Sequence, residues 1–145
     1  MAKELDSQAH FVSYAPPAFI PFRNRPYLQL SLTTTLPVGA AGSQYRLAAL
    51  AFDQHVAHLI RPVIAYFKDR SDFDGIDFST TVRLAAASSD GGALAVEFIF
   101  PLKLLRSYAD FDCTGQQLID AGYVLINGER VSLNLQAAEA GAAAQ

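Results

Sequence analysis

The sequence predicts an α+β protein in which one long amphipathic helix packs on a curved, mostly antiparallel sheet of about five strands. Apolar residues recur at steps of three and four between Tyr45 and Phe67, which is typical of a helix buried along one side. On either side of that segment, apolar and polar residues alternate, as they do in half-buried strands. The predicted order is strand, long helix, two strands, short helices and two strands.

The first strand is expected from Tyr27 to Leu36. Leu28, Leu30 and Leu32 alternate with polar residues, so one face of this strand should be buried and the other open.

The long helix is expected from about residue 44 to residue 69, with Ser43 as its N-cap. Pro62 lies inside it and should kink it, because proline removes one helical hydrogen bond and crowds the carbonyl of His58. The apolar stripe consists of Tyr45, Ala48, Phe52, Val56, Leu59, Val63 and Phe67.

A hairpin is predicted to follow, with strands over residues 76–84 and 94–100. Their apolar faces match only if paired residue numbers have an even sum, which predicts an odd-length loop with Gly91 or Gly92 at positive φ. A sum of 180 would place Arg83 opposite Glu97 as an ion pair across the strands.

The C-terminal part predicts two short helices and a second hairpin. Residues 102–108 form the first helix, and the Thr114–Gln117 pair is a capping box for the second. Asn127-Gly128 is a strong two-residue turn signal that pairs Val124 with Val131.

Three regions are expected. Residues 1–26 read as an extended arm because they hold four of the seven prolines together with several aromatic residues. Residues 27–135 form the single α+β domain, and the alanine-rich residues 136–145 read as a flexible tail.

This element order over residues 27–135 resembles the cystatin-like layout, in which a curved antiparallel sheet wraps one long helix. The resemblance implies a fold and no activity, because the Gln-x-Val-x-Gly hairpin and tryptophan loop of the protease-inhibiting cystatins are missing. The first hairpin tip reads Ser88-Ser89-Asp90-Gly91-Gly92, and the chain has no tryptophan.

Composition excludes several classes of protein. The chain of 145 residues is 51% hydrophobic and 17% charged, as expected of a soluble globular domain. Its net charge is −3 and its 11 lysines and arginines are scattered, which disfavours nucleic-acid binding. No transmembrane segment or signal peptide is evident, so a cytoplasmic protein is the default expectation. An exported protein whose leader had been replaced by Met1 would look the same.

No metal, cofactor or catalytic signature is found. His55 and His58 could share a metal, but no further ligand pattern supports one. Asp69, Asp72, Asp74 and Asp77 could suggest a calcium-binding loop, but their spacing does not match the EF-hand pattern. Cys113 precedes a helix start without a base near it in the sequence, so a structural thiol is expected. The protein is therefore expected not to be an enzyme.

The leading functional hypothesis is a binding or assembly module that uses the N-terminal arm or the open sheet face, with self-association or a protein partner. Aromatic and arginine residues are the usual anchors of interfaces. The interaction candidates are Phe19, Phe22, Arg23, Arg25 and Tyr27. The alternative is a small-ligand-binding protein or enzyme with a pocket between the kinked helix and the sheet. Its candidate residues are His55, Asp77, Arg83 and Cys113.

Overall fold

A computed structural model describes residues 18–36, 43–67, 73–84 and 94–136, and it contains one six-stranded sheet. The strands lie side by side in chain order, and all neighbours are antiparallel except β2 and β3. The strands are β1 (Ala18–Phe22), β2 (Arg25–Leu36), β3 (Gly75–Leu84), β4 (Leu94–Pro101), β5 (Tyr123–Ile126) and β6 (Glu129–Val131). The predicted α+β class is confirmed, with β1 from the predicted arm as an additional edge strand.

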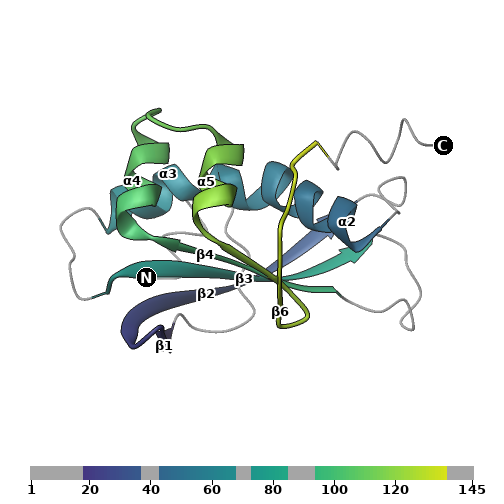
Figure 1. Cartoon of the computed structure of the whole chain (residues 1–145), viewed down its shortest axis with the longest axis horizontal. Helices are drawn as coiled ribbons and strands as arrows, with labels where there is room; N and C mark the ends of the chain where they lie inside the picture. The colour runs from purple at the N-terminus through teal and green to yellow at the C-terminus, as the bar shows by residue number, and fades with distance from the viewer. Residues whose placement is uncertain (1–17, 37–42, 68–72, 85–93, 137–145) are drawn as a thin grey trace.

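The helices all lie on one side of the sheet, and β1 forms one of its edges (Figure 1). A long helical segment joins the parallel strands β2 and β3, as parallel neighbours require a crossover. This segment consists of α2 (Gln44–Ala51), η2 (Phe52–Val56) and α3 (Ala57–Tyr66), and α4 (Leu102–Ala109) and α5 (Gly115–Ala121) complete the layer.

The long helix begins where the sequence predicts. The Ser43 side chain accepts a hydrogen bond from the Arg46 amide at 3.1 Å, which satisfies one of the free amides of the first turn. The helix ends at Tyr66, three residues before the predicted position.

Within the long helix, the departure from α geometry lies at η2, a π-helical turn that the sequence analysis did not foresee. Such turns insert an extra residue per turn and are frequent at functional sites. Pro62 lies inside α3, and the kink expected there stays a prediction.

The main core lies between the helices and one face of the sheet. Phe52 packs on Phe98 and Phe100, with ring centroids 5.4 and 6.3 Å apart. The leucines of β2 that were predicted to point inward are buried, which confirms the alternation in that strand. The opposite face, called the open face below, also holds buried residues, namely Tyr27, Ser31, Asp77 and Ile99.

The register of β3 and β4 has an even sum, as predicted, but the sum is 176 because Phe78 lies opposite Phe98. A sum of 180 would place Phe78 opposite Leu102, the first residue of α4. The predicted pair of Arg83 and Glu97 is therefore wrong: Glu97 lies opposite Ser79. Gly91 and Gly92 lie outside the described residues.

The last hairpin and its preceding helix follow the prediction closely. Val124 pairs with Val131, and Asn127 and Gly128 have φ angles of 50° and 86°, as a two-residue turn requires. The Asn127 side chain also accepts a hydrogen bond from the Ala95 amide, which fixes the turn to β4. The Thr114–Gln117 capping box begins α5.

Candidate functional site

The turn between β1 and β2 reaches across the open face to the start of β5. Arg23 and Asn24 form this turn with φ angles of 52° and 65°. The Arg23 guanidinium donates a hydrogen bond to the Tyr123 hydroxyl, although β2 and β5 are separated by two strands. The Phe22 ring lies 5.1 Å from both the Tyr27 and the Tyr123 ring, measured between centroids. Because the turn bends over the sheet in this way, residues distant in sequence meet at one site.

These residues surround an open cavity of about 460 Å³, called the basic aromatic cavity here. Three cationic side chains and one carboxylate give it a local net charge of +2, in a chain whose net charge is −3. Its lining residues are Phe22, Arg23, Arg25, Tyr27, Asp74, Pro101, Lys103 and Tyr123.

The charges of the cavity are mostly available to a ligand. Arg25 forms an ion pair with Asp74 at 3.3 Å, but both side chains are exposed, so the pair is weakly held. Lys103 is exposed at the first turn of α4. An anionic group entering the cavity would therefore meet cations that are only partly compensated.

Two guanidinium groups contact the Tyr123 ring. The Cζ atoms of Arg23 and Arg130 lie 5.5 and 4.2 Å from the ring centroid, which are cation–π distances. Tyr123 is thereby held by groups from the β1–β2 turn and from β6, so the wall it forms is preorganised.

Tyr27 forms the floor of the cavity beside Gly75. A side-chain carbon on Gly75 would lie 2.3 Å from Cε2 of Tyr27, so only glycine lets the ring lie here. Burial raises the pKa of Tyr27, and the neighbouring Asp74 and Tyr123 raise it further. The hydroxyl therefore stays protonated at neutral pH and can donate a hydrogen bond.

Four of the five predicted interaction residues line this cavity. The fifth, Phe19, lies apart on β1, 60% exposed and 6.2 Å from the Phe73 ring. The sequence analysis did not assign Lys103 to a site, and it considered Asp74 only as a possible calcium ligand. Both residues join the cavity only through the folding of the sheet, because Lys103 follows β4 and Asp74 precedes β3.

Asp77 lies on the open face and is fully buried. Its Oδ2 accepts a hydrogen bond from Gln29 at 3.1 Å, whereas Oδ1 has no donor in the described part of the chain. Burial raises the pKa of Asp77 to about 8, and the neighbouring Glu97 carboxyl contributes to the rise. Burial beside a second carboxyl favours the protonated form of a carboxyl group, so Asp77 is largely neutral at pH 7.

His55 lies on the other side of the sheet, in η2. Its Nδ1 is 2.8 Å from the Thr34 hydroxyl, which is 2.6 Å from the Thr80 hydroxyl. Burial lowers the pKa of His55, and His58 lowers it further, so the ring is neutral at pH 7. Beside it is an open cavity of about 320 Å³, lined by Thr33, Thr34, Thr35, Leu36, Gln54 and His55.

The four predicted pocket residues are not brought together. His55 and Asp77 lie on opposite sides of the sheet, and Arg83 is exposed near the C-terminal end of β3. Cys113 is half-buried beside α5, where burial and then Asp112 raise the pKa of its thiol. Its sulfur is thus a thiol at neutral pH, which disfavours a nucleophilic role.

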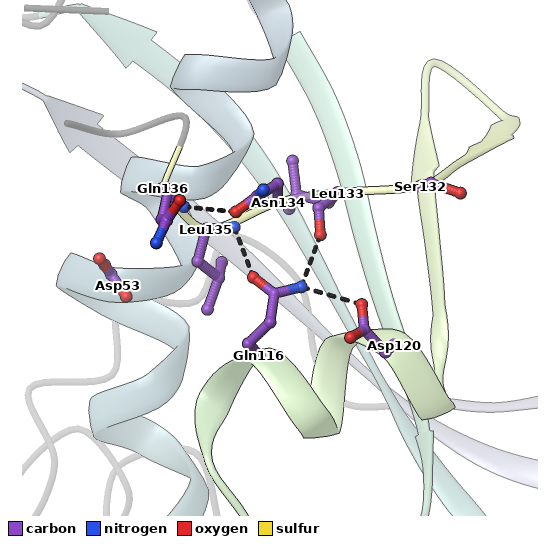
Figure 2. A pocket seen from close by; sticks show the side chains of 8 residues that line it. All are labelled: Asp53, Gln116, Asp120, Ser132, Leu133, Asn134, Leu135 and Gln136. Carbon is purple, nitrogen blue, oxygen red and sulfur yellow. Dashed lines mark hydrogen bonds between the residues drawn. The ribbon is translucent and has the colours of Figure 1, made fainter. Parts of the chain in front are cut away.

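A larger open cavity of about 740 Å³ lies between α5 and the segment after β6 (Figure 2). One of its polar groups, the Gln116 amide, donates to Asp120 and to the Leu133 carbonyl and accepts from the Leu135 amide. These bonds hold residues 133–135 against α5, so the amide serves the fold here.

No protein-family model matches the chain, and neither the curated proteins nor the solved structures gave a match. The described residues contain no group of three or more metal-binding side chains, and none of their helices is both long and apolar enough to cross a membrane. Fold and site together define an α+β protein with a basic aromatic cavity where the open face of its sheet meets the first turn of α4.

Proposed function

We propose that this protein is a non-enzymatic binding and assembly module, and that the basic aromatic cavity binds a peptide segment carrying an aromatic ring beside carboxylates. The observation that carries the proposal is the meeting of Phe22, Tyr27 and Tyr123 with Arg23, Arg25 and Lys103 around one cavity. The rings offer edges and faces to an aromatic side chain, and the cations offer charge-assisted hydrogen bonds to carboxylates.

The cavity supports binding better than catalysis. Asp77, whose raised pKa would suit an acid or a base, and the half-buried His55 do not line it. Its walls come from rigid elements that are fixed to one another by ring contacts and by the bond between Arg23 and Tyr123. Preorganised aromatic and arginine groups are the usual hot spots of protein interfaces.

A tryptophan peptide tests the proposal directly, because the chain has no tryptophan and all such fluorescence would come from the peptide. We expect a capped Gly-Asp-Trp-Asp-Gly peptide to bind with a blue shift of its emission. Gly-Lys-Trp-Lys-Gly should not bind. Lys103→Glu should weaken binding roughly tenfold, since a hydrogen bond to a charged group contributes about 1.5 kcal/mol or more.

Arg83→Glu is the matched control, because it makes the same charge change on an exposed residue at the opposite end of β3 from Gly75. It should bind the acidic peptide as the wild type does. Equal binding of the acidic and basic peptides, or equal losses in the two variants, would contradict a specific site in the cavity.

A further inference from the structure

The chain itself carries a segment with the chemistry that the cavity would bind. The loop between α4 and α5 presents Asp110, Phe111 and Asp112, which are all exposed and are called the acidic tip here. Phe111 is 79% exposed, although it is a large apolar residue. Its φ angle of 63° is one that bulky side chains rarely adopt. The loop therefore holds the ring outward in a strained backbone conformation.

The acidic tip is held in this conformation by several contacts. The Phe111 amide donates to the Tyr108 carbonyl at 3.1 Å, and the Asp112 amide donates to the Ser107 carbonyl at 2.8 Å. From α3, Arg61 donates to the carbonyls of Tyr108 and Ala109, and its Cζ lies 3.9 Å from the centroid of the Phe111 ring. The ring and its two neighbouring carboxylates are thus preorganised, which reduces the entropy that binding would cost.

We propose that the acidic tip of one copy enters the basic aromatic cavity of a second copy, so that the protein assembles head to tail. This inference rests on the proposed function of the cavity and names its occupant. The Phe111 ring would contact the aromatic rings of the cavity, and the carboxylates of Asp110 and Asp112 would meet the cations. The cavity residues in these contacts are Phe22, Arg23, Arg25, Tyr27, Lys103 and Tyr123.

One copy cannot fill its own cavity. The loop between α4 and α5 lies at the outer side of the helical layer, and the β1–β2 hairpin lies at the edge of the sheet, away from that loop (Figure 1). The cavity takes Lys103 from the first turn of α4 and its other residues from the sheet and the segments beside it, whereas the tip follows the last turn of α4, so the tip and the cavity are different surfaces. An interface between two different surfaces repeats from copy to copy and produces a closed ring or an open filament.

Two variants of the full-length chain test the pairing. Phe111→Ala with Asp112→Lys removes the tip and leaves the cavity, while Lys103→Glu with Arg23→Gln weakens the cavity and leaves the tip. Sedimentation velocity should show that the mass of the wild type grows with concentration, and that each variant alone stays a single chain. An equimolar mixture should contain a complex of two chains and nothing larger, because only one productive interface can form. Arg83→Glu should assemble like the wild type.

Two results would overturn the inference. One is a wild type that remains a single chain at the highest concentration reached. The other is an assembly that persists when the tip is removed. The tip variant distinguishes these failures from failure of the proposed function, because its intact cavity should still bind the acidic tryptophan peptide. Peptide binding without assembly would reject the acidic tip as occupant and keep the binding module, whereas loss of both would reject the two proposals together.

Discussion

Asp77→Asn is expected to make the protein more stable than the wild type at pH 8 and above, and to leave the two nearly equal near pH 4. An asparagine at this position keeps the oxygen that accepts from Gln29 and adds an amide that can donate to Glu97. It therefore reproduces the neutral form of the buried carboxyl without its titration.

The sign of the pH dependence of stability follows from the direction in which folding shifts the pKa of Asp77. Folding raises the pKa of Asp77 from 3.8 to about 8, so between these values the folded chain holds a proton that the unfolded chain has released. Stability from this group is fully present below pH 4 and is lost as the pH rises toward 8. The loss amounts to at most about 1.4 kcal/mol for each pH unit crossed.

Urea unfolding at several values between pH 4 and pH 9 measures this effect. The difference between the unfolding free energies of Asp77→Asn and wild type should grow up to about pH 8 and then level off. Asp120→Asn, which changes an exposed carboxyl on α5, is the control and should not alter the slope. A constant difference between Asp77→Asn and wild type across the range would show that Asp77 is ionised in the folded protein.

Local signals in the sequence predicted most of the fold. Ser43, the Thr114–Gln117 box and Asn127-Gly128 each act through hydrogen bonds or dihedral angles within a few residues, and all three were confirmed. The alternation in β3 and β4 fixed the parity of their register. The alternation could not fix which residues pair, and so could not fix the sum of their numbers, because registers that differ by two residues bury the same faces.

What the sequence did not predict depends on distant contacts. The prolines at 21 and 26 indicated an extended arm, and its pairing with the sheet was not predicted. The two prolines lie opposite each other in the β1–β2 pair, and β1 is an edge strand, where a missing amide is tolerated. The burial of Asp77 was also missed, because alternation assigns it to a polar face. Only the structure shows that Asp77 is buried on that face, where it lies opposite Ile99.

The candidate site was predicted in part for the same reason. The arginines and aromatic residues near the β1–β2 turn were identified as anchors from their chemistry. Asp74 and Lys103 come from segments that reach the cavity only after the sheet has formed. An aspartate before a strand or a lysine in a first helical turn is common in proteins, so the sequence alone does not indicate that these two residues line a cavity.

Gly75→Ala is expected to destabilise the protein and to abolish binding in the basic aromatic cavity. The added carbon would lie 2.3 Å from the Tyr27 ring and 2.4 Å from the Phe100 carbonyl oxygen. The ring could turn aside, but the carbonyl belongs to the paired strand β4 and cannot move without breaking the ladder. Overpacking of this kind costs typically about 1–3 kcal/mol.

Gly115→Ala is the matched control, since its added carbon would meet its nearest neighbours, side chains of Leu135 and Phe52, at 3.4 Å, near ordinary contact distance. Gly115 is the first residue of α5, where alanine loses less backbone freedom on folding than glycine does, so this variant should be as stable as the wild type or more so. Urea midpoints and titration with the acidic tryptophan peptide should separate the two variants. If Gly75→Ala kept its midpoint but lost the peptide, displacement of the Tyr27 ring alone would account for the loss, and the cavity would depend on that ring. If it kept both, Tyr27 would not form the floor of the site.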